Sequence, residues 1–426
     1  MTYQQARQYL DRFPRFEVKP GLKRIQQLLE SLDQPQLAHP TIHVGGTNGK
    51  GSVVAMLDAV LRAAGFSVGR FTSPELIDFR DRIAVDGEWI SEADLTATVE
   101  RMAPMIEALD EIPSQFEIVA ALAFDYLARS RVDISVVEVG LGGRFDATNV
   151  ICPKLAILTN VTLDHQAILG DTVEAIAWEK AGIAKQDVPL LTAGLSESIL
   201  QIVRTECRAV RAILSIVDDI AITQASRDWD AATYDVVWDS PIQRIALPLI
   251  GGAQCNNLRL VLGAIQTLRS RGFDIPDVAV TDGLQSVHWP GRLEVVRRKP
   301  TILLDGAHND AAIQALASDV CELIPDPKHR FLLYGALGDK DVDAALISLG
   351  AVFPSIGLCV ADNPRALSME HLTEKAQRTF QQIVQYHTIV EGIDSWLAYA
   401  SQDDVLVITG SLTVVGEARR WLMEGL

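Results

Sequence analysis

The chain has 426 residues, of which 48% are hydrophobic and 22% are charged, and its formal net charge is −17. This length predicts two or three domains with packed cores. The negative charge argues against a general surface for nucleic acid or for an anionic membrane. The five cysteines are scattered without a Cys-x-x-Cys pair, which favours thiols in a reducing compartment over disulfides or a zinc site. Without a signal peptide or an apolar run of about 18 residues, we expect a cytoplasmic protein.

The most informative stretch is a glycine-rich turn near the N-terminus. Residues 1–40 are expected to be helical in two pieces, and residues 42–52 then read Ile-His-Val-Gly-Gly-Thr-Asn-Gly-Lys-Gly-Ser. Residues 53–64 follow with a helical apolar stripe. A strand, a glycine loop and a helix N-terminus form a phosphate cradle, in which Lys50 neutralises the β and γ phosphates. The alternative is a plain strand-to-helix turn, but such a turn has no use for a lysine.

Strands and helices alternate along the rest of the chain. A hairpin with an Asp-Gly turn is expected over 82–90, and Ser91 is expected to cap the helix that follows. Further strands are expected at 67–71, 133–139, 155–160 and 188–192, and helices at 115–129, from about 172, and at 253–271. Residues 215–250 lose the rhythm and are expected to form short antiparallel strands. A fresh alternation begins later, with strands at 301–305, 330–335, 355–361, 383–389 and 404–409.

This alternation predicts an α/β protein with mostly parallel sheets that are covered on both faces. We expect an N-terminal P-loop ATPase domain over residues 1–295, with a small β-rich insertion. A smaller C-terminal Rossmann-like α/β domain is expected over residues 296–426. The boundary is placed near 294–299, at the charged run Arg297-Arg298-Lys299.

Glu138 stands at the end of an otherwise apolar strand. A carboxylate there costs several kcal/mol unless a cation or hydrogen bonds satisfy it, and in a P-loop protein this is the place of a Mg²⁺ ligand. The alternative is a carboxylate that caps a neighbouring helix. Taken alone, His165 would be structural and Lys180 an ordinary surface lysine. For Phe116 the alternative is a core residue of its helix. For Asp305 the alternative is a plain turn, which its position at a strand end and the nearby arginine argue against.

The run Thr47-Asn48-Gly49-Lys50-Gly51-Ser52 resembles the ATP loop of the folylpolyglutamate synthase/dihydrofolate synthase family, a branch of the Mur ligase superfamily. That superfamily shares the shortened glycine spacing and the glycine between the lysine and the serine. The resemblance runs from about residue 20 to 415. It is carried in matching order by segments 73–76, 115–117, 138–149, 163–165, 179–183, 253–257, 290–292, 305–309, 335–341 and 409–412.

The resemblance implies a site for ATP and for two Mg²⁺ ions. The implied ATP-binding residues are Thr47, Asn48, Gly49, Lys50, Gly51, Ser52, Asn257, Arg292 and Asp305. The implied metal ligands are Ser52, Ser73, Glu138 and His165. The implied catalytic residues are Lys50, Lys180 and His308, and Lys180 is expected to be carbamylated, which turns a cation into an anion that can hold Mg²⁺.

The resemblance also implies where the other substrates bind. Phe116 is expected to stack on a pterin ring, and Asp146 is expected to hydrogen-bond that ring. Segments 335–341 and 409–412, the latter with Ser411, are expected to frame the amino-acid side of the cleft. One position departs from the family, because the residue after Pro74 is usually histidine and is Glu75 here.

The activity that the resemblance implies is ATP-dependent amide formation through an acyl phosphate. L-Glutamate would be added to dihydropteroate, to reduced folates, or to both, by a monomer that binds neither nucleic acid nor membrane. A P-loop kinase or GTPase is the alternative from another class, and the second α/β domain argues against it. Another Mur-type ligase, such as a cell-wall amino-acid ligase, is the nearer alternative. Such ligases usually carry a further N-terminal domain, for which the P-loop at residue 45 leaves no room.

Overall fold

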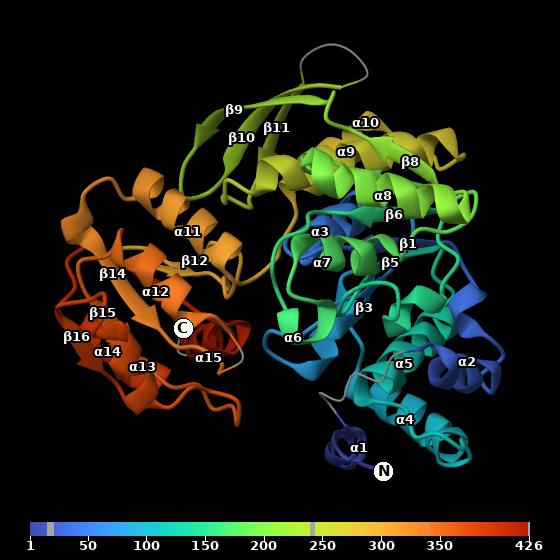
Figure 1. Ribbon diagram of the computed structural model, residues 1–426, viewed down its shortest axis with the longest axis horizontal. Coiled ribbons are helices and arrows are strands. Elements are labelled where there is room, and N and C mark those ends of the chain that lie inside the picture. The colour runs from blue at the N-terminus through green and yellow to red at the C-terminus, as the bar shows by residue number, and fades with distance from the viewer. Residues whose placement is uncertain (15–20, 239–242, 339, 425–426) are drawn as a thin grey trace. The chain divides into compact units, whose positions relative to one another are not determined.

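The computed structural model describes residues 1–14, 21–238, 243–338 and 340–424 (Figure 1). The chain divides into two compact units. The first comprises Met1–Thr223, Asp235–Ile245 and Cys255–Val287, and the second comprises Gln224–Tyr234, Ala246–Gln254 and His288–Leu426. Each unit contains its own mostly parallel sheet, which confirms the predicted α/β class. The functional boundary at 295/296 stays a prediction, since the second compact unit already includes residues from 288.

The sheet of the first unit has eight strands in the order β4-β3-β2-β5-β1-β6-β7-β8. From β2 to β8 neighbouring strands pair in parallel, whereas β3 and β4 form an antiparallel hairpin at one edge. The central strands are buried along their whole length, as expected for a sheet that is covered on both faces. Its strands are β1 (Thr41–Gly45), β2 (Val68–Phe71), β3 (Ile83–Val85), β4 (Glu88–Trp89), β5 (Ile134–Glu138), β6 (Leu155–Leu158), β7 (Pro189–Thr192) and β8 (Ile213–Ile216).

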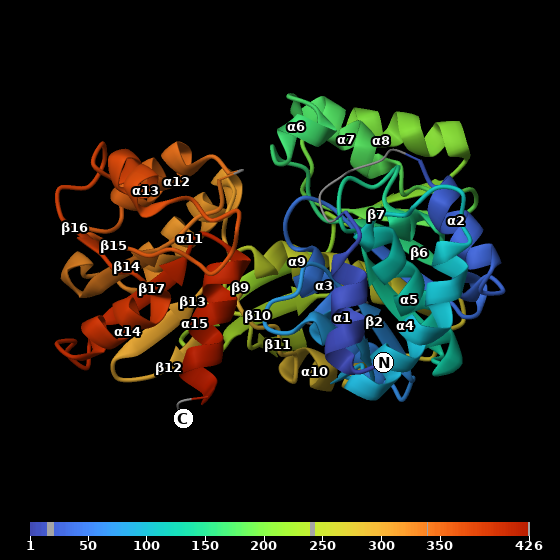
Figure 2. The same cartoon turned by 90° about the horizontal axis from the view of Figure 1, so that it is seen from below.

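Helices cover this sheet on both faces. One hydrophobic cluster joins α1, α2, α4 and α5 to β2 and β5, and Figures 1 and 2 show α1 beside α4. A second cluster joins α7 and α8 to β6 and β7. The helices are α1 (Tyr3–Asp11), α2 (Lys23–Glu30), α3 (Lys50–Ala63), α4 (Glu92–Glu107), α5 (Gln115–Arg129), α6 (Gln166–Leu169), α7 (Val173–Ala181), α8 (Glu197–Val210), α9 (Gln254–Ser270) and α10 (Asp277–Gln285); short 3-10 helices are Pro35–Leu37, Phe79–Arg82 and Ala147–Val150.

Several local predictions are confirmed. Asp86 and Gly87 both have positive φ, as a two-residue hairpin turn requires, and the Ser91 side chain accepts from the Asp94 N–H to begin α4. The two predicted N-terminal helical pieces are α1 and α2, with residues 15–20 outside the described residues. Two expectations need correction: helix α3 begins at Lys50 rather than at residue 53, and β8 pairs in parallel with β7. Helices α6, α8 and α10 were not predicted.

The predicted β-rich insertion is a three-stranded sheet in the order β11-β10-β9. Its strands are β9 (Ala221–Arg227), β10 (Ala232–Val237) and β11 (Gln243–Leu247). The part of the predicted segment at 239–242 lies outside the described residues. Two stretches of the insertion belong to the second unit. There Arg227 Nη1 and the Gly252 N–H both donate to Asp319 Oδ1 of α11 (Asp310–Leu323), the latter at 2.9 Å.

The sheet of the second unit has six strands in the order β12-β13-β17-β14-β15-β16. All neighbours pair in parallel except β12, which is antiparallel to β13. The charged run that suggested a domain boundary therefore belongs in part to an edge strand. The remaining elements are β12 (Glu294–Arg297), β13 (Thr301–Leu304), β14 (Arg330–Tyr334), β15 (Ile356–Leu358), β16 (Ile383–Gln385), β17 (Val405–Thr409), α12 (Val342–Gly350), α13 (Met369–Ala376), α14 (Ile389–Leu397), α15 (Leu412–Glu424) and the 3-10 helix Pro327–His329.

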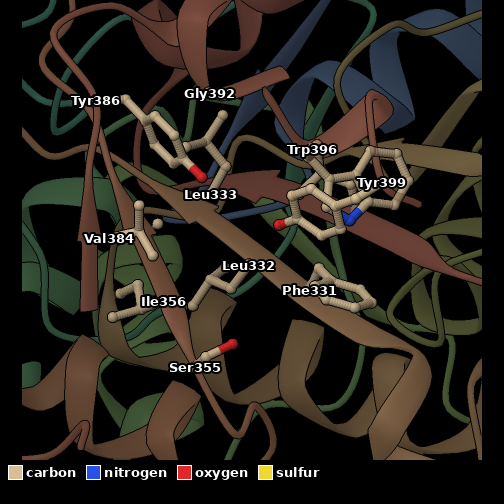
Figure 3. A pocket seen from close by; sticks show the side chains of 12 residues that line it. Phe331, Leu332, Leu333, Ser355, Ile356, Val384, Tyr386, Gly392, Trp396 and Tyr399 are labelled. Atoms are coloured by element: carbon tan, nitrogen blue, oxygen red, sulfur yellow. The ribbon is translucent and has the colours of Figure 1, made fainter. Parts of the chain in front are cut away.

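An aromatic pocket lies between α14 and the second sheet (Figure 3). Phe331, Trp396 and Tyr399 line it together with aliphatic residues of β14 and β15. Its lining includes residues of the strands predicted at 330–335 and 355–361, and no predicted site residue is among them. Among the helices of the described residues, none combines the length and the apolar character that crossing a membrane requires.

Candidate active site

The predicted phosphate loop lies between β1 and α3 at the carboxyl edge of the first sheet. Val44 pairs with Glu138 and Gly45 with Leu158, so β1, β5 and β6 end side by side. Open α/β sheets bind their ligands at this edge. Gly49 begins α3 with φ at +84°, and a Cβ there would lie 2.5 Å from Asn257 Oδ1. The structure thus places the predicted Asn257 directly against the loop.

The loop that follows β6 holds the phosphate loop in shape. Asn160 accepts twice, its carbonyl from the Thr47 N–H at 3.0 Å and its Oδ1 from the Asn48 N–H at 2.8 Å. The Thr159 hydroxyl donates to the Asn48 carbonyl at 2.7 Å. Sequence reasoning missed Thr159 and Asn160. The only signal was their position as the first polar residues after a buried strand.

Two lysines meet at one carbonyl oxygen of the phosphate loop. Lys50 Nζ donates to the carbonyl oxygens of Gly46 and Thr47 at 3.1 and 3.0 Å, and Lys180 Nζ donates to that of Gly46 at 2.9 Å. Burial, together with the nearby Lys50 ammonium, lowers the pKa of Lys180 to about 7. Lys180 is therefore a buried amine close to neutrality, not the ordinary surface lysine that the residue pattern alone favoured.

Glu138 is buried at the end of β5, and its Oε2 accepts from the Ser73 N–H at 3.2 Å. Ser52 is buried in the first turn of α3. His165 begins α6 with φ at +50°, and its half-exposed ring has Nε2 3.8 Å from Asp164 Oδ1. Within the described ranges, no cluster of three or more His, Cys, Asp or Glu could hold a metal ion. The oxygen donors fit Mg²⁺ held by few protein groups plus phosphates and water, as is usual for this ion.

Phe116 lies in the first turn of α5, with its ring against Gly140. A Cβ at Gly140 would lie 2.3 Å from Phe116 Cζ, and the ring centroid of Phe71 is 6.1 Å from that of Phe116. The Ser114 side chain accepts from the Glu117 N–H to begin the helix. Phe116 is only partly buried, so one part of its ring is packed by the protein and another is available for contact.

Asp146 closes the glycine-rich loop after β5. Its Oδ1 accepts from the Thr148 N–H at 2.9 Å and from the Thr148 hydroxyl, and its Oδ2 accepts from the Leu141 N–H at 2.8 Å. Burial raises the pKa of Asp146, and these hydrogen bonds oppose the rise. His43 Nε2 lies 2.8 Å from Thr148 Oγ1. Because the Thr148 hydroxyl donates to Asp146, His43 is the donor to Thr148 Oγ1. Burial, with a smaller contribution from the positive charge of Lys185, lowers the pKa of His43 to about 3. The ring of His43 is therefore neutral.

Three predicted residues of the second unit meet after β13. Asp305 accepts from the Leu293 and Ala307 N–H groups, each at 2.8 Å, and burial raises its pKa to about 6 although Arg292 opposes this. A Cβ at Gly306 would lie 2.6 Å from Arg292 Nη1, and His308 Nδ1 donates to the Gly306 carbonyl at 2.7 Å. The turn that the alternative predicted is present, but His308 lies in it and Arg292 lies against its Gly306.

Ser411 lies in the same unit, directly after β17. It is buried, and its Oγ accepts from the Val414 N–H at 3.2 Å. In the predicted segment 335–341, Leu337 forms a bridge with Ala366, and Asp339 lies outside the described residues. The structure thus groups the predicted residues of each unit within that unit.

Two family models match parts of this chain. Residues 44–265 match the Mur ligase middle domain, and residues 291–412 match the Mur ligase, glutamate ligase domain. The dihydrofolate synthase/folylpolyglutamate synthase of Bacillus subtilis (strain 168) is 35% identical over 434 residues, which cover 99% of each chain.

Solved structures are similar over nearly the whole chain. Mycobacterium tuberculosis folylpolyglutamate synthase complexed with ADP has a TM-score of 0.91 and 32% identity, over 99% of this chain and 98% of that one. E. coli FolC in complex with DHPP and ADP has a TM-score of 0.88 and 26% identity, over 100% of this chain and 98% of that one. The chain belongs to the folylpolyglutamate synthase/dihydrofolate synthase family of Mur-type ligases.

Proposed function

We propose that the chain is an ATP-dependent ligase that joins L-glutamate to the carboxyl group of dihydropteroate, of a reduced folate, or of both. The observation that carries the proposal is the phosphate loop at which Lys50 and the near-neutral Lys180 share the Gly46 carbonyl. A charged Lys50 at a phosphate loop suits the transfer of a phosphoryl group, whose charge must be stabilised. Membership of a family whose relatives are named as dihydrofolate and folylpolyglutamate synthases supports the substrates.

The proposed reaction has two steps. An oxygen of the acceptor carboxylate attacks the γ-phosphorus of ATP, the bond between that phosphorus and the ADP oxygen breaks, and an acyl phosphate forms. The neutral amino group of L-glutamate then attacks the acyl carbon, loses a proton, and phosphate leaves. Excluding water protects the acyl phosphate from hydrolysis.

The phosphate loop is proposed to bind the nucleotide through residues 47–52. The N-terminus of a helix offers backbone N–H groups that can donate to an anion. In the described geometry Lys50 donates to two loop carbonyls, and it is proposed to exchange them for phosphate oxygens of higher charge. Asn257, already against Gly49, is proposed to contact the nucleotide base.

Ser52, Ser73, Glu138 and His165 are the residues proposed to hold two Mg²⁺ ions. Bound Mg²⁺ would neutralise charge on the phosphates of ATP. Glu138 is the buried carboxylate of this set. Its orientation by the Ser73 N–H suits a ligand that must meet a cation at a defined place.

Lys180 is proposed to be carbamylated. A carbamate forms when a neutral amine attacks the carbon of CO₂ and loses a proton, and a pKa of about 7 leaves a large neutral fraction at physiological pH. We expect a carbamate signal in ¹³C NMR after incubation with labelled bicarbonate, and its loss in Lys180→Met. A wild-type spectrum without that signal would contradict the proposal.

Other roles rest on the resemblance and the local geometry. Phe116 and Asp146 are proposed to bind the pterin ring, and Ser411 the amino-acid side. Arg292 and Asp305 are proposed to bind ATP, and His308 to take part in catalysis. We also propose a cytoplasmic monomer without nucleic-acid or membrane partners, and sedimentation of the purified chain tests the monomer.

Phosphate release from ATP tests the function directly. With Mg²⁺ and L-glutamate present, we would compare dihydropteroate, a tetrahydrofolate and no acceptor. Release that requires both glutamate and an acceptor supports the ligase, and the acceptor that works distinguishes the two synthase activities. A folded chain that binds ATP but releases no phosphate with either acceptor would overturn the proposal.

A further inference from the structure

The loop of residues 73–82 begins at the candidate active site and is held by hydrogen bonds. Its first residue, Ser73, donates its N–H to Glu138 at 3.2 Å. Asp81 Oδ2 accepts from the N–H groups of Leu76 and Ile77, each at 2.9 Å, and the Thr72 N–H donates to the Arg82 carbonyl at 2.8 Å. These bonds fix the loop and place position 75 two residues from the contact with Glu138.

The carboxylate of Glu75 forms an ion pair with the guanidinium of Arg82. Arg82 Nε donates to Glu75 Oε2 at 2.7 Å, and Arg82 Nη2 donates to the same oxygen. The side chain of Arg82 is 12% exposed and that of Glu75 is 31% exposed, so the pair lies at the surface of the loop with its cation on the inner side. A charge-assisted pair with two donors on one carboxylate is a strong and directional contact.

Arg82 is also held independently of Glu75. Its guanidinium carbon lies 5.2 Å from the centre of the Phe79 ring, and that of Arg7 lies 3.6 Å from the same ring. Cation–π contacts of this kind hold an arginine in place. Arg82 would therefore keep its position if Glu75 lost its charge, and one edge of its guanidinium would become available to another carboxylate.

Acceptors of the proposed reaction differ in their number of carboxylates. Dihydropteroate has one, which must be phosphorylated, whereas every glutamate already attached to a folate adds one more. An arginine fork is the side chain best suited to pair with such an additional carboxylate. In this chain the guanidinium of Arg82 is already paired with the carboxylate of Glu75. An additional carboxylate of the acceptor would be repelled by the negative charge of Glu75.

We propose that Glu75 determines acceptor specificity: by occupying Arg82, it makes the enzyme prefer the acceptor with one carboxylate, dihydropteroate, over glutamylated folates. The inference rests on the proposed ligase activity and deepens it.

The test compares kcat/KM for dihydropteroate, tetrahydrofolate and a tetrahydrofolate diglutamate. In Glu75→Gln and in Glu75→His, we expect the ratio of tetrahydrofolate to dihydropteroate to rise by about fivefold, the upper range for a partly exposed ion pair. The rise should be larger for the diglutamate and should appear mainly in KM. Glutamine has the shape of glutamate, and if it nevertheless misfolds, the histidine variant answers the same question.

Two further variants separate this inference from other causes. Asp78→Asn weakens the neighbouring pair of Asp78 and Arg80 on the same loop, and it should leave the ratio unchanged. The double variant Glu75→Gln with Arg82→Gln should not show the rise in the kcat/KM ratio, because the guanidinium that would bind the additional carboxylate is absent. An unchanged ratio in a folded Glu75→Gln overturns the inference alone, whereas the proposed function fails only if the wild-type chain turns over neither acceptor.

Discussion

Lys50 and Lys180 donate to the same carbonyl oxygen, that of Gly46, over 3.1 and 2.9 Å. Two ammonium groups at one acceptor repel each other, and the repulsion is strong where water is excluded. The conflict is relieved because burial and Lys50 lower the pKa of Lys180 to about 7. One of the two lysines can thus be neutral while the other keeps its charge for the phosphates.

Lys50→Met should reduce turnover by at least about 100-fold, the loss typical when one stabilising group of a transition state is removed. The reason is the loss of the cation that faces the transferring phosphoryl group. Phosphate release measures turnover, and calorimetry with ATP measures binding. Lys154→Met, at an exposed lysine, is the matched control and should behave as wild type. Turnover of Lys50→Met near the wild-type rate would disprove the phosphate-loop assignment.

The lowered pKa of Lys180 predicts a pH-dependent stability. Between about pH 7 and the ordinary value of 10.5, the unfolded chain binds a proton that the folded chain does not, so the free energy of unfolding should rise with pH. The cost of burying the charged amine is complete below pH 7 and vanishes above 10.5. In buffer without CO₂, the Tm of wild type relative to Lys180→Met should rise across this window. Parallel Tm curves would contradict the prediction.

His43, Thr148 and Asp146 form one buried hydrogen-bonded chain. Thr148→Val removes a donor to Asp146 and the acceptor of His43, and it should lower the free energy of unfolding by about 1–3 kcal/mol. His43→Leu should lower the free energy of unfolding less in the Thr148→Val variant than in the wild type, because the hydrogen-bond partner of His43 is already absent there. Urea unfolding of the single and double variants tests this. Strictly additive losses would show that the contacts act separately.

Gly140→Ala should displace the ring of Phe116, since its new methyl group would lie 2.3 Å from Phe116 Cζ. We expect KM for the pterin acceptor to rise while the affinity for ATP stays unchanged. Adding Phe116→Leu should relieve the clash and restore Tm without restoring the acceptor KM. If the double variant instead had the wild-type KM for the acceptor, Phe116 would not be part of the pterin site.

Features that depend on local sequence were predictable. The bounds of α5 agree with the predicted 115–129, because an apolar helical pattern marks them. Helix α3 begins earlier than predicted, at Lys50, since its first turn has no apolar pattern and is started by the left-handed Gly49. The edge strand β12 was missed because charged residues suit a sheet edge as well as a linker.

Features that depend on distant residues were not predictable. Asn48 contacts Thr159 and Asn160, which are more than 100 positions away along the chain. Asp146 was expected to serve a pterin ring, and nothing in the sequence indicated that Leu141 and Thr148 would donate to it. A motif indicates the chemistry of a residue, but its hydrogen-bond partners depend on the folded chain.

The contacts of Asp319 constrain how domains can be exchanged between relatives. Its carboxylate accepts from Arg227 and from Gly252, which lie outside the C-terminal stretch but inside the second unit. A chimera joined at 295/296 would combine Asp319 from one parent with Arg227 and Gly252 from another. The second unit therefore consists of three separate segments of chain. Hybrids in which all three segments come from one parent should fold more often than hybrids made by a single crossover.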